Sequence, residues 1–568
     1  DRYTLYLDAA YELAEGFELY TELLYNKRTS YYDGSGQIWQ FGFGDRTGGD
    51  FAPESRRDQN ANGFGGPALF SPTGFIDWYD SSQTVQYYRA VVGLRGDISS
   101  SFQYDLYGQY SLSDGDYSNQ IVLNDSIRTQ DGRNIVNAPN GYRTARCPGG
   151  VTPIGGKACT FVDWYSARVM YGDYTPEEFN FLTDTDTGNT EFTQAYIEAV
   201  VSGDLFTLWG NGPVGIAFGG TFRRDEINDV PGAMTLADNV WQGLGAGITA
   251  GNSDTLEGFG EINIPLLADL PLIQSFDVTA AARITNVSVV RPSDGVTAED
   301  NGNITYKLGA DWEVTDWLRF RGTYGTSFRA PALFEQLLEN QEGSLSQRSL
   351  DPCIGWGVAL ARGDISQQFA NNCQADGVAS THTGSGIDGV VITGGGIGVL
   401  DAETSTAWTA SMVLTPSFSF LPDTQISIAV DYFDIEVKGE IAQFGARRIL
   451  TACYNSEFFP TDPLCSLFAR VGDLSEDDPY WVDGSETNVA FVRDSFININ
   501  SQQNRGVDVT TRIDHDFAGD TTLSFQAQMT WQTRDQIAVY QDTPSDLNGE
   551  AGEPKWVGDF NLQLDTGP

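Results

Sequence analysis

Hydrophobic and polar residues alternate with a period of two along much of the chain. Residues 521–532 have one apolar face and one face of hydroxyl and amide groups; the apolar face is formed by Leu523, Phe525, Ala527, Met529 and Trp531. The same division recurs in residues 276–285, 304–314 and 318–329. Because side chains point alternately to the two faces of a strand, this pattern predicts β-strands with one polar and one apolar face.

Comparable segments number about sixteen, and short turns alternate with long connections rich in Gly, Asn and Asp between them. The short turns are expected at 14–16, 98–101, 315–316 and 518–520, and the long connections at 31–83, 114–189, 330–403 and 439–487. Outer-membrane barrels have this asymmetry, with short turns on the periplasmic side and long loops outside. We therefore expect an all-β protein, an antiparallel transmembrane β-barrel, with residues 1–568 in a single domain.

The polar faces of these strands carry Asp, Glu, Lys and Arg. Charged groups are costly in a dry core but ordinary in a wide lumen that holds water or a plug, so the apolar faces would meet lipid. Tyr and Trp cluster near the strand ends, which favours an interfacial aromatic girdle, although β-propensity alone also enriches these residues in strands.

The composition excludes several function classes. The 568 residues include 33 Lys+Arg and 77 Asp+Glu, a net charge of -44, so no basic surface is available to bind nucleic acid. There are only two histidines, and we predict no catalytic residues, no metal site and no cofactor. The acidic string at 184–189 has the oxygen spacing of a calcium loop but lacks the bidentate acid that should follow it.

Six cysteines form three pairs that are close in sequence: Cys147 with Cys159, Cys353 with Cys373, and Cys453 with Cys465. Each pair lies in a segment rich in Gly, Pro, Asn or Asp. Local disulfides in exposed loops of an oxidising compartment are the favoured interpretation. Spacing does not prove this pairing, and unpaired thiols stay an alternative.

Residues 316–337 read DWLRFRGTYGTSFRAPALFEQL, which resembles the barrel signature of TonB-dependent outer-membrane receptors. Five further segments resemble the same family in the correct order: 202–227, 258–285, 399–416, 430–441 and 504–513. Together they cover most of residues 190–567.

The resemblance implies a barrel of about 22 strands around an N-terminal plug. With about sixteen strands, this chain is expected to be an incomplete barrel that lacks the plug, the first strands and the last strands. The resemblance also implies a bacterial outer-membrane receptor that binds a scarce extracellular ligand and imports it actively. Its expected partners are the TonB energy-transducing complex, outer-membrane lipid and a small-molecule or oligosaccharide ligand.

Two groups of side chains are candidates for function. Loop aromatics could stack on a sugar or an aromatic chelate, or pack within their own loops; they are Tyr454, Phe458, Phe459, Tyr480 and Trp481. Cations on the polar strand faces could contact the plug or an anionic ligand, or pair with carboxylates of the barrel wall; they are Arg283, Lys307, Arg319, Arg321 and Arg329.

An enzyme is disfavoured because the chain has neither a Gly-x-Ser-x-Gly elbow nor a phosphate loop. Since carboxylates are numerous, a secreted all-β glycan-active enzyme stays the alternative, and a passive porin is the third possibility.

Overall fold

The computed structural model describes residues 1–566 except 40–41, 44–68, 71–72, 130–134, 138–142, 146, 163–165, 210, 242, 244, 385–387, 476–477, 479, 482–485, 518–520 and 539–543. Among these residues, no helix is long and apolar enough to cross a membrane.

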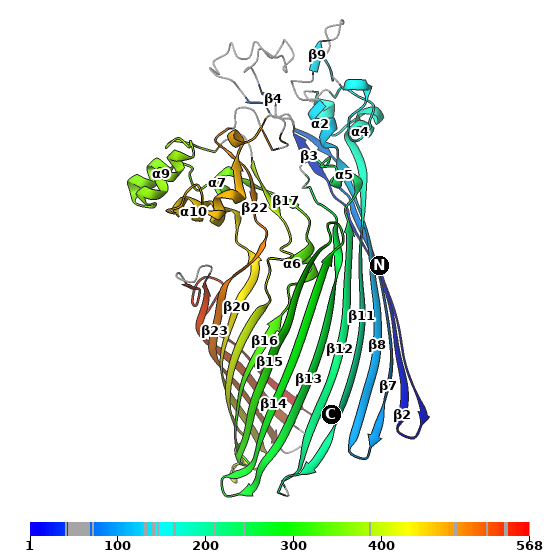
Figure 1. Cartoon of the computed structure of the whole chain (residues 1–568), viewed down its shortest axis with the longest axis vertical. Helices are drawn as coiled ribbons and strands as arrows, with labels where there is room; N and C mark the ends of the chain where they lie inside the picture. The colour runs from blue at the N-terminus through cyan, green and yellow to red at the C-terminus, as the bar shows by residue number, and fades with distance from the viewer. Residues whose placement is uncertain are drawn as a thin grey trace.

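One antiparallel sheet of sixteen strands forms most of the molecule, in agreement with the predicted strand number (Figure 1). Neighbours in sequence are neighbours in the sheet, in the order β1 (Arg2–Ala14), β2 (Phe17–Tyr32), β7 (Ser81–Ser99), β8 (Phe102–Val122), β11 (Thr183–Thr207), β12 (Pro213–Val230), β13 (Thr249–Leu270), β14 (Ile273–Arg291), β15 (Val296–Thr315), β16 (Leu318–Arg329), β19 (Glu403–Leu414), β20 (Thr424–Gln443), β23 (Phe496–Phe517) and β24 (Thr521–Ala538). The last two strands, β25 (Pro544–Asp546) and β26 (Trp556–Thr566), both pair with β24.

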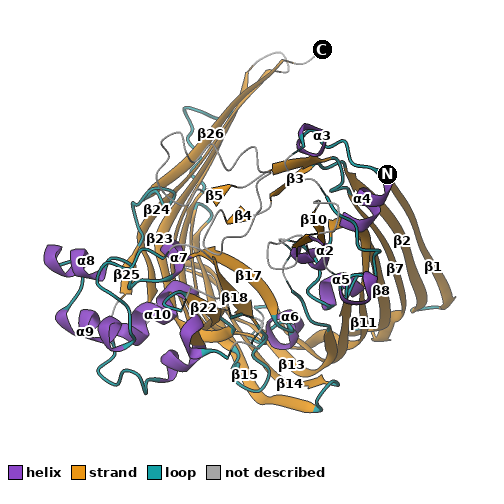
Figure 2. Cartoon of the chain, turned by 90° about the horizontal axis from the view of Figure 1, so that it is seen from above, coloured by secondary structure: helices purple, strands orange, loops and turns teal. Residues whose placement is uncertain are grey.

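The sheet is strongly curved, and among the described strands no hydrogen bonds join β1 to β25 or β26 (Figure 2). The predicted fold class, an antiparallel sheet of barrel type, is confirmed. Closure of the barrel, its full strand number and the absence of a plug from this chain stay predictions.

The long connections all lie at one end of the strands, together with the short link between β14 and β15 at 292–295, and short connections lie at the other end (Figure 1). The predicted turn between β1 and β2 is confirmed and uses Gly16 at φ +72°, a conformation that costs other residues steric strain. The predicted turns between β7 and β8 and between β15 and β16 are also present, whereas the one at 518–520 lies outside the described residues. Long connections follow β2, β8, β16 and β20, as predicted.

Two strands extend further into the loop region than the alternation predicted. β8 continues to Val122 and β11 begins at Thr183, and the two pair without interruption over this stretch. The string at 184–189 is therefore part of a paired strand and not a calcium loop. Polar residues are tolerated here because the two strands are joined by backbone hydrogen bonds, which do not require apolar side chains.

Two of the long connections fold together into a small domain, which we call the loop domain. It contains a sheet ordered β17 (Gln341–Ser346), β18 (Asp388–Thr393), β22 (Val489–Arg493) and β21 (Phe468–Arg470). Its helices are α7 (Gln347–Leu350), α8 (Trp356–Arg362), α9 (Gln367–Ala375), α10 (Ala446–Asn455), η3 (Pro463–Leu467) and η4 (Val471–Asp473), and α6 (Leu333–Leu337) lies at its base. It has its own apolar core, which includes Leu350, Phe369, Ile449, Leu450 and Val489.

The remaining long connections form a second group, the N-terminal loop cluster. It contains β3 (Gly36–Trp39), β4 (Gly42–Phe43), β5 (Leu69–Phe70), β6 (Thr73–Ile76), α2 (Asn124–Thr129), β9 (Ile135–Asn137), β10 (Arg143–Ala145), η2 (Pro148–Gly150), α3 (Ala167–Met170), α4 (Pro176–Leu182) and α5 (Ala233–Leu236). Ile38, Ile76, Val122, Phe181 and Leu182 pack together in its core.

The three predicted disulfides are confirmed: Cys147–Cys159 lies in the N-terminal loop cluster, and Cys353–Cys373 and Cys453–Cys465 lie in the loop domain. All three are within loops at one end of the strands, so they stiffen the loop layer and not the sheet.

Candidate functional site

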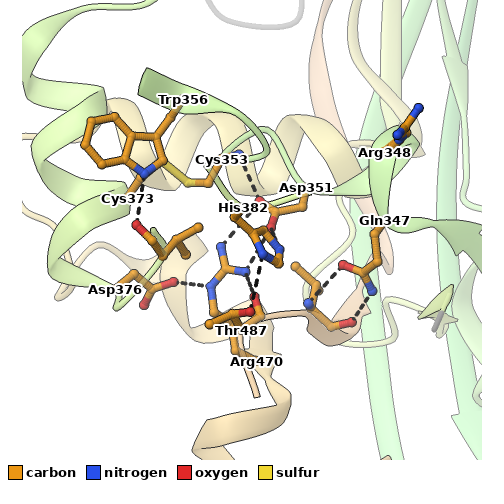
Figure 3. A network of polar contacts seen from close by, with 12 residues as sticks. Gln347, Arg348, Asp351, Cys353, Trp356, Cys373, Asp376, His382, Arg470 and Thr487 are labelled. Carbon is orange, nitrogen blue, oxygen red and sulfur yellow. Dashed lines mark hydrogen bonds and ion pairs between the residues drawn. A yellow bond between two sulfur atoms is a disulfide. The ribbon is translucent and has the colours of Figure 1, made fainter. Parts of the chain in front are cut away.

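A buried arginine joins the two loops of the loop domain. Arg470, at the end of β21, donates from Nη1 to Oδ2 of Asp351 at 2.9 Å and to the carbonyl of Thr487 at 2.6 Å (Figure 3). Its Nη2 donates to the Tyr454 hydroxyl at 2.7 Å, and its Nε pairs with Asp376. Asp351 and Asp376 follow β16 whereas Arg470 follows β20, so this network joins two loops into one body.

A second contact between the same two loops is formed by Gln347 of α7. Its side-chain amide donates to the Val489 carbonyl at 2.7 Å, and its carbonyl oxygen accepts the Val489 N–H at 3.0 Å (Figure 3). The Gln347 side chain is buried, so this pair satisfies groups that would otherwise be costly.

His382 lies against the arginine network. Its Nδ1 is 3.3 Å from the Thr487 hydroxyl, and its Nε2 is 3.9 Å from Oδ2 of Asp351 (Figure 3). Burial lowers the pKa of His382; the Asp351 carboxylate opposes this effect and the Arg470 guanidinium adds to it. The imidazole is therefore neutral at neutral pH. Burial also raises the pKa of the Tyr454 phenol, which donates to Asp376 at 2.6 Å.

A hollow of about 940 Å³ opens beside the N-terminal loop cluster. Four of its lining residues form one row across neighbouring strands, because Tyr32 lies opposite Ser81, Ser81 opposite Asn119, and Asn119 opposite Asp186. By the same register, this row shares its face with Arg89, which forms an ion pair with Glu22. The hollow therefore lies on the polar face of the sheet.

Both carboxylates of the hollow have partners. Asp80 accepts hydrogen bonds from the Gly34 N–H, at 3.1 Å, and from the Tyr31 hydroxyl. Asp186 accepts the N–H groups that begin α5, from Met234 at 2.9 Å and Thr235 at 3.0 Å. Gly232 permits this approach, since a Cβ there would lie 2.2 Å from the Asp186 carboxyl carbon. Asp186 thus holds α5 on the concave side of the sheet (Figure 2).

The family model described as "TonB dependent receptor-like, beta-barrel" matches residues 26–567. The chain belongs to the TonB-dependent receptor family. Members of this family are outer-membrane transporters, and they work with TonB. None of the curated proteins compared matches the chain.

Several solved structures are similar to the chain. They include the RagAB peptide transporter (11% identity, TM-score 0.48, covering 95% of this chain and 47% of that one). The ferripyoverdine receptor of Pseudomonas aeruginosa has 11% identity and a TM-score of 0.45, covering 99% of this chain and 52% of that one. The hemophore receptor HasR of Serratia marcescens has 11% identity and a TM-score of 0.37, covering 99% and 70%. The chain spans about half the length of the first two of these solved structures.

Three of the predicted cations on the polar faces of this TonB-dependent receptor form ion pairs across strands. Arg283 pairs with Glu257 at 3.1 Å, Arg319 donates to Asp311 at 2.7 Å, and Arg329 binds Glu403 through two hydrogen bonds of 2.6 Å. Arg329 also bonds Glu335 of α6, so it connects a strand end to the loop layer.

Lys307 and Arg321 form no ion pair with another described residue of the receptor. Contact of any of the five cations with a plug or ligand stays a prediction.

The five predicted aromatics all lie in the loop domain but in different surroundings. Tyr454 is fully buried and Phe459 packs against the core beside it, with ring centroids 5.6 Å apart. Tyr480 donates to Glu342 and lies against Phe491. Trp481 is half-buried, and Phe458 is 73% exposed. Only Phe458 thus presents most of its ring to solvent, and ligand contact by the group stays a prediction.

The sequence did not identify Arg470, Asp351 or Gln347, or the row that lines the hollow. These residues are polar and lie in irregular segments or at strand ends, where no periodicity distinguishes a buried side chain from an exposed one. The two flanking cysteine pairs were the available signal that this part of the chain has a fold of its own.

Proposed function

We propose that this chain forms part of the barrel domain of an outer-membrane receptor that binds a scarce extracellular ligand and imports it with energy supplied through TonB. The family match over residues 26–567 supports the transport class. The plug and the TonB-contacting segment belong to the rest of the receptor in this proposal, and outer-membrane lipid is the third partner.

The observation that carries the membrane part of the proposal is a belt of exposed apolar side chains on one face of the sheet. Ile304 and Leu308 of β15, Trp408 of β19 and Trp531 of β24 are 43% to 65% exposed. Soluble proteins rarely expose apolar patches this extensive, since they would associate in water. The opposite face carries the ion pairs of Arg283, Arg319 and Arg329, so lipid is the solvent that suits the belt and water suits the other face.

The upper boundary of this belt moves along the strands in steps. Toward the loop end of this face, the apolar run ends at Trp408 on β19, Tyr432 on β20 and Trp531 on β24, while Tyr324 on β16 is followed by Thr326 and then by Phe328. Tyr324 and Trp408 lie opposite each other, but Trp408 lies opposite the polar Asp434, so the boundary on β20 is two residues lower. Strands that cross a flat membrane at a tilt produce such a stepped boundary, and Tyr and Trp favour the interface.

The loop layer is where ligand recognition belongs in this proposal. It contains both candidate surfaces, the loop domain and the hollow, and it is stiffened by three disulfides. Rigid loops lose less conformational entropy when they bind a ligand.

The test compares a strain that lacks the full-length receptor with one that lacks TonB, over a panel of sole carbon and iron sources. We expect both strains to fail on the same source, and the receptor to fractionate with the outer membrane. A passive porin predicts that loss of TonB leaves uptake through this protein unchanged. A secreted glycan-active enzyme predicts a protein that dissolves without detergent and cleaves its substrate. Either result would overturn the proposal.

A further inference from the structure

The hollow beside the N-terminal loop cluster has the composition of a ligand site. Its volume of about 940 Å³ is within the range of known small-molecule sites, about 300–1,000 Å³. Its row of lining residues lies near the loop ends of β2, β7, β8 and β11 on the polar face of the sheet. The helix α5, which Asp186 holds at this row, lies inside the curve of the sheet (Figure 2). A ligand entering from outside therefore reaches the hollow before the lumen.

Aromatic rings form part of its wall. Tyr32 is 66% exposed and Phe75 is 43% exposed, while Tyr79 and Trp241 are half-buried. Two of these rings therefore offer open surface to an incoming molecule. The C–H faces of a sugar ring are apolar and stack on such rings, whereas its hydroxyls project sideways.

Amides and hydroxyls form another part of the wall. Gln37 and Asn119 are exposed, and Ser81 adds a hydroxyl. The half-buried Gln120 accepts the Asp80 N–H at 3.2 Å and the Thr235 hydroxyl donates to Asp186 at 2.6 Å, so these two side chains are partly engaged within the chain. An amide side chain presents a donor and an acceptor side by side, and a hydroxyl serves as either. Neighbouring hydroxyls of a sugar require this combination.

Charge excludes the main competing ligands. Among the described residues that line the hollow there is no Lys, Arg or His, and its two carboxylates, Asp80 and Asp186, already accept hydrogen bonds from the chain. An anion would therefore meet two carboxylates and none of the described cations, in a protein with a net charge of -44. A cation would find both carboxylates engaged.

We propose that this hollow is a ligand site of the receptor and that it takes an uncharged, hydroxyl-rich ligand, a neutral oligosaccharide. The proposal rests on the receptor function proposed above and specifies its substrate class. Tyr32 and Asn119, which lie in one row on the same face with Ser81 of β7 between them, supply a stacking surface and a paired donor and acceptor.

The test uses the purified full-length receptor in detergent on a glycan array of neutral, anionic and cationic saccharides, with ferrichrome as a ferric chelate in a separate titration. We expect binding to neutral saccharides alone. Tyr32→Ala should weaken it about threefold to tenfold, the range of an aromatic contact, and Asn119→Ala should also weaken it. Tyr171→Ala is the matched control, since Tyr171 is 85% exposed in the same cluster but does not line the hollow.

Thermal unfolding of each variant checks that it is folded. Binding of charged saccharides or of ferrichrome in place of neutral ones, no binding to the array, or neutral binding that Tyr32→Ala and Asn119→Ala leave unchanged would each overturn the assignment. The uptake test on TonB is independent of it: TonB-dependent import of a charged ligand would retain the receptor function and reject this substrate class.

Discussion

The guanidinium of Arg470 lies 2.9 Å from the carboxylate of Asp351, although 119 residues separate them in sequence. The two side chains are 3% and 0% exposed, respectively. They belong to loops that leave different strands, so their ion pair joins the two loops, together with the pairing of β18 with β22 and the shared apolar core. A buried pair of this kind adds little to stability over apolar residues, but loss of one partner leaves an uncompensated charge.

Arg470→Met should therefore destabilise the loop domain by about 3–5 kcal/mol. Amide hydrogen exchange in β22 measures this, because Val489 and its neighbours are buried behind the network. Arg447→Met is the control, since Arg447 of α10 is exposed and donates only to two backbone carbonyls. Equal exchange in the two variants would show that the network does not stabilise the domain.

The disulfide Cys353–Cys373 should stabilise the loop domain and no other part of the chain. Its sulfurs are buried in that domain, and a cross-link over a comparable number of residues contributes about 3 kcal/mol in the chain-entropy view. Replacing both cysteines by alanine should accelerate exchange in β18 and β22. The same change at Cys147 and Cys159 should leave these strands unaffected, because that disulfide lies in the N-terminal loop cluster. A similar effect from both pairs would contradict the separation of the two groups of loops.

The alternation along the strands predicted the sheet because a membrane protein with a wet lumen requires two chemically different faces on every strand. The same reasoning located the turns after β1, β7 and β15, the long connections and Arg329. The alternation did not predict the observed ends of β8 and β11, because both faces of these strands are largely polar near the loops and the alternation disappears there. Nor could it bring Arg470 to Asp351, because contacts between distant irregular segments leave no periodic trace.

The cysteine pattern predicted the correct disulfides for a simpler reason: each pair is close enough in sequence for a local bridge. The aromatic residues of the same loops could not be divided into buried and exposed from the sequence, because Tyr454 and Phe458 are only four residues apart and chemically similar. The structure separates them through α10, which ends between them at Asn455 and directs Tyr454 into the core.

Acidification should loosen the loop domain through His382. Its pKa in the folded domain is below the ordinary value of 6.5, because it is buried and faces Arg470, while Asp351 offsets this only in part. As the pH falls below about 6.5, His382 binds a proton in the unfolded segment before it does so in the folded domain. The contribution of His382 to the stability of the loop domain is therefore fully present above this pH and decreases below it. Exchange in β22, corrected for intrinsic rates, should rise more between pH 7.5 and 5.5 in the wild type than in His382→Gln. Equal slopes would show that another group governs the acid response.

Tyr454 and Phe458 should respond differently to substitution. Tyr454→Phe removes a buried hydroxyl that bonds Asp376 and Arg470, so it should cost about 1–3 kcal/mol of loop-domain stability. Phe458→Ala should leave stability nearly unchanged, since most of its ring is in solvent. If Phe458 contacts ligand as predicted, its variant should weaken ligand binding without altering hydrogen exchange. A stability loss at Phe458 equal to that at Tyr454 would contradict this division.

Two arginines of β16 provide a test of the polar face. Arg329 bonds Glu403 on the neighbouring strand and Glu335 of α6, whereas Arg321 forms no ion pair with another described residue. Arg329→Gln should lower the stability by about 1 kcal/mol, a modest value because the guanidinium is 46% exposed and solvent screens it. Arg321→Gln should leave the thermal unfolding of the full-length receptor unchanged. Since Arg321, unlike Arg329, forms no ion pair among the described residues, its removal should instead change contacts with a plug or ligand. Thermal unfolding of both variants, combined with the uptake assay, separates these roles: a stability loss at Arg321 as large as that at Arg329 would place both arginines in the barrel wall.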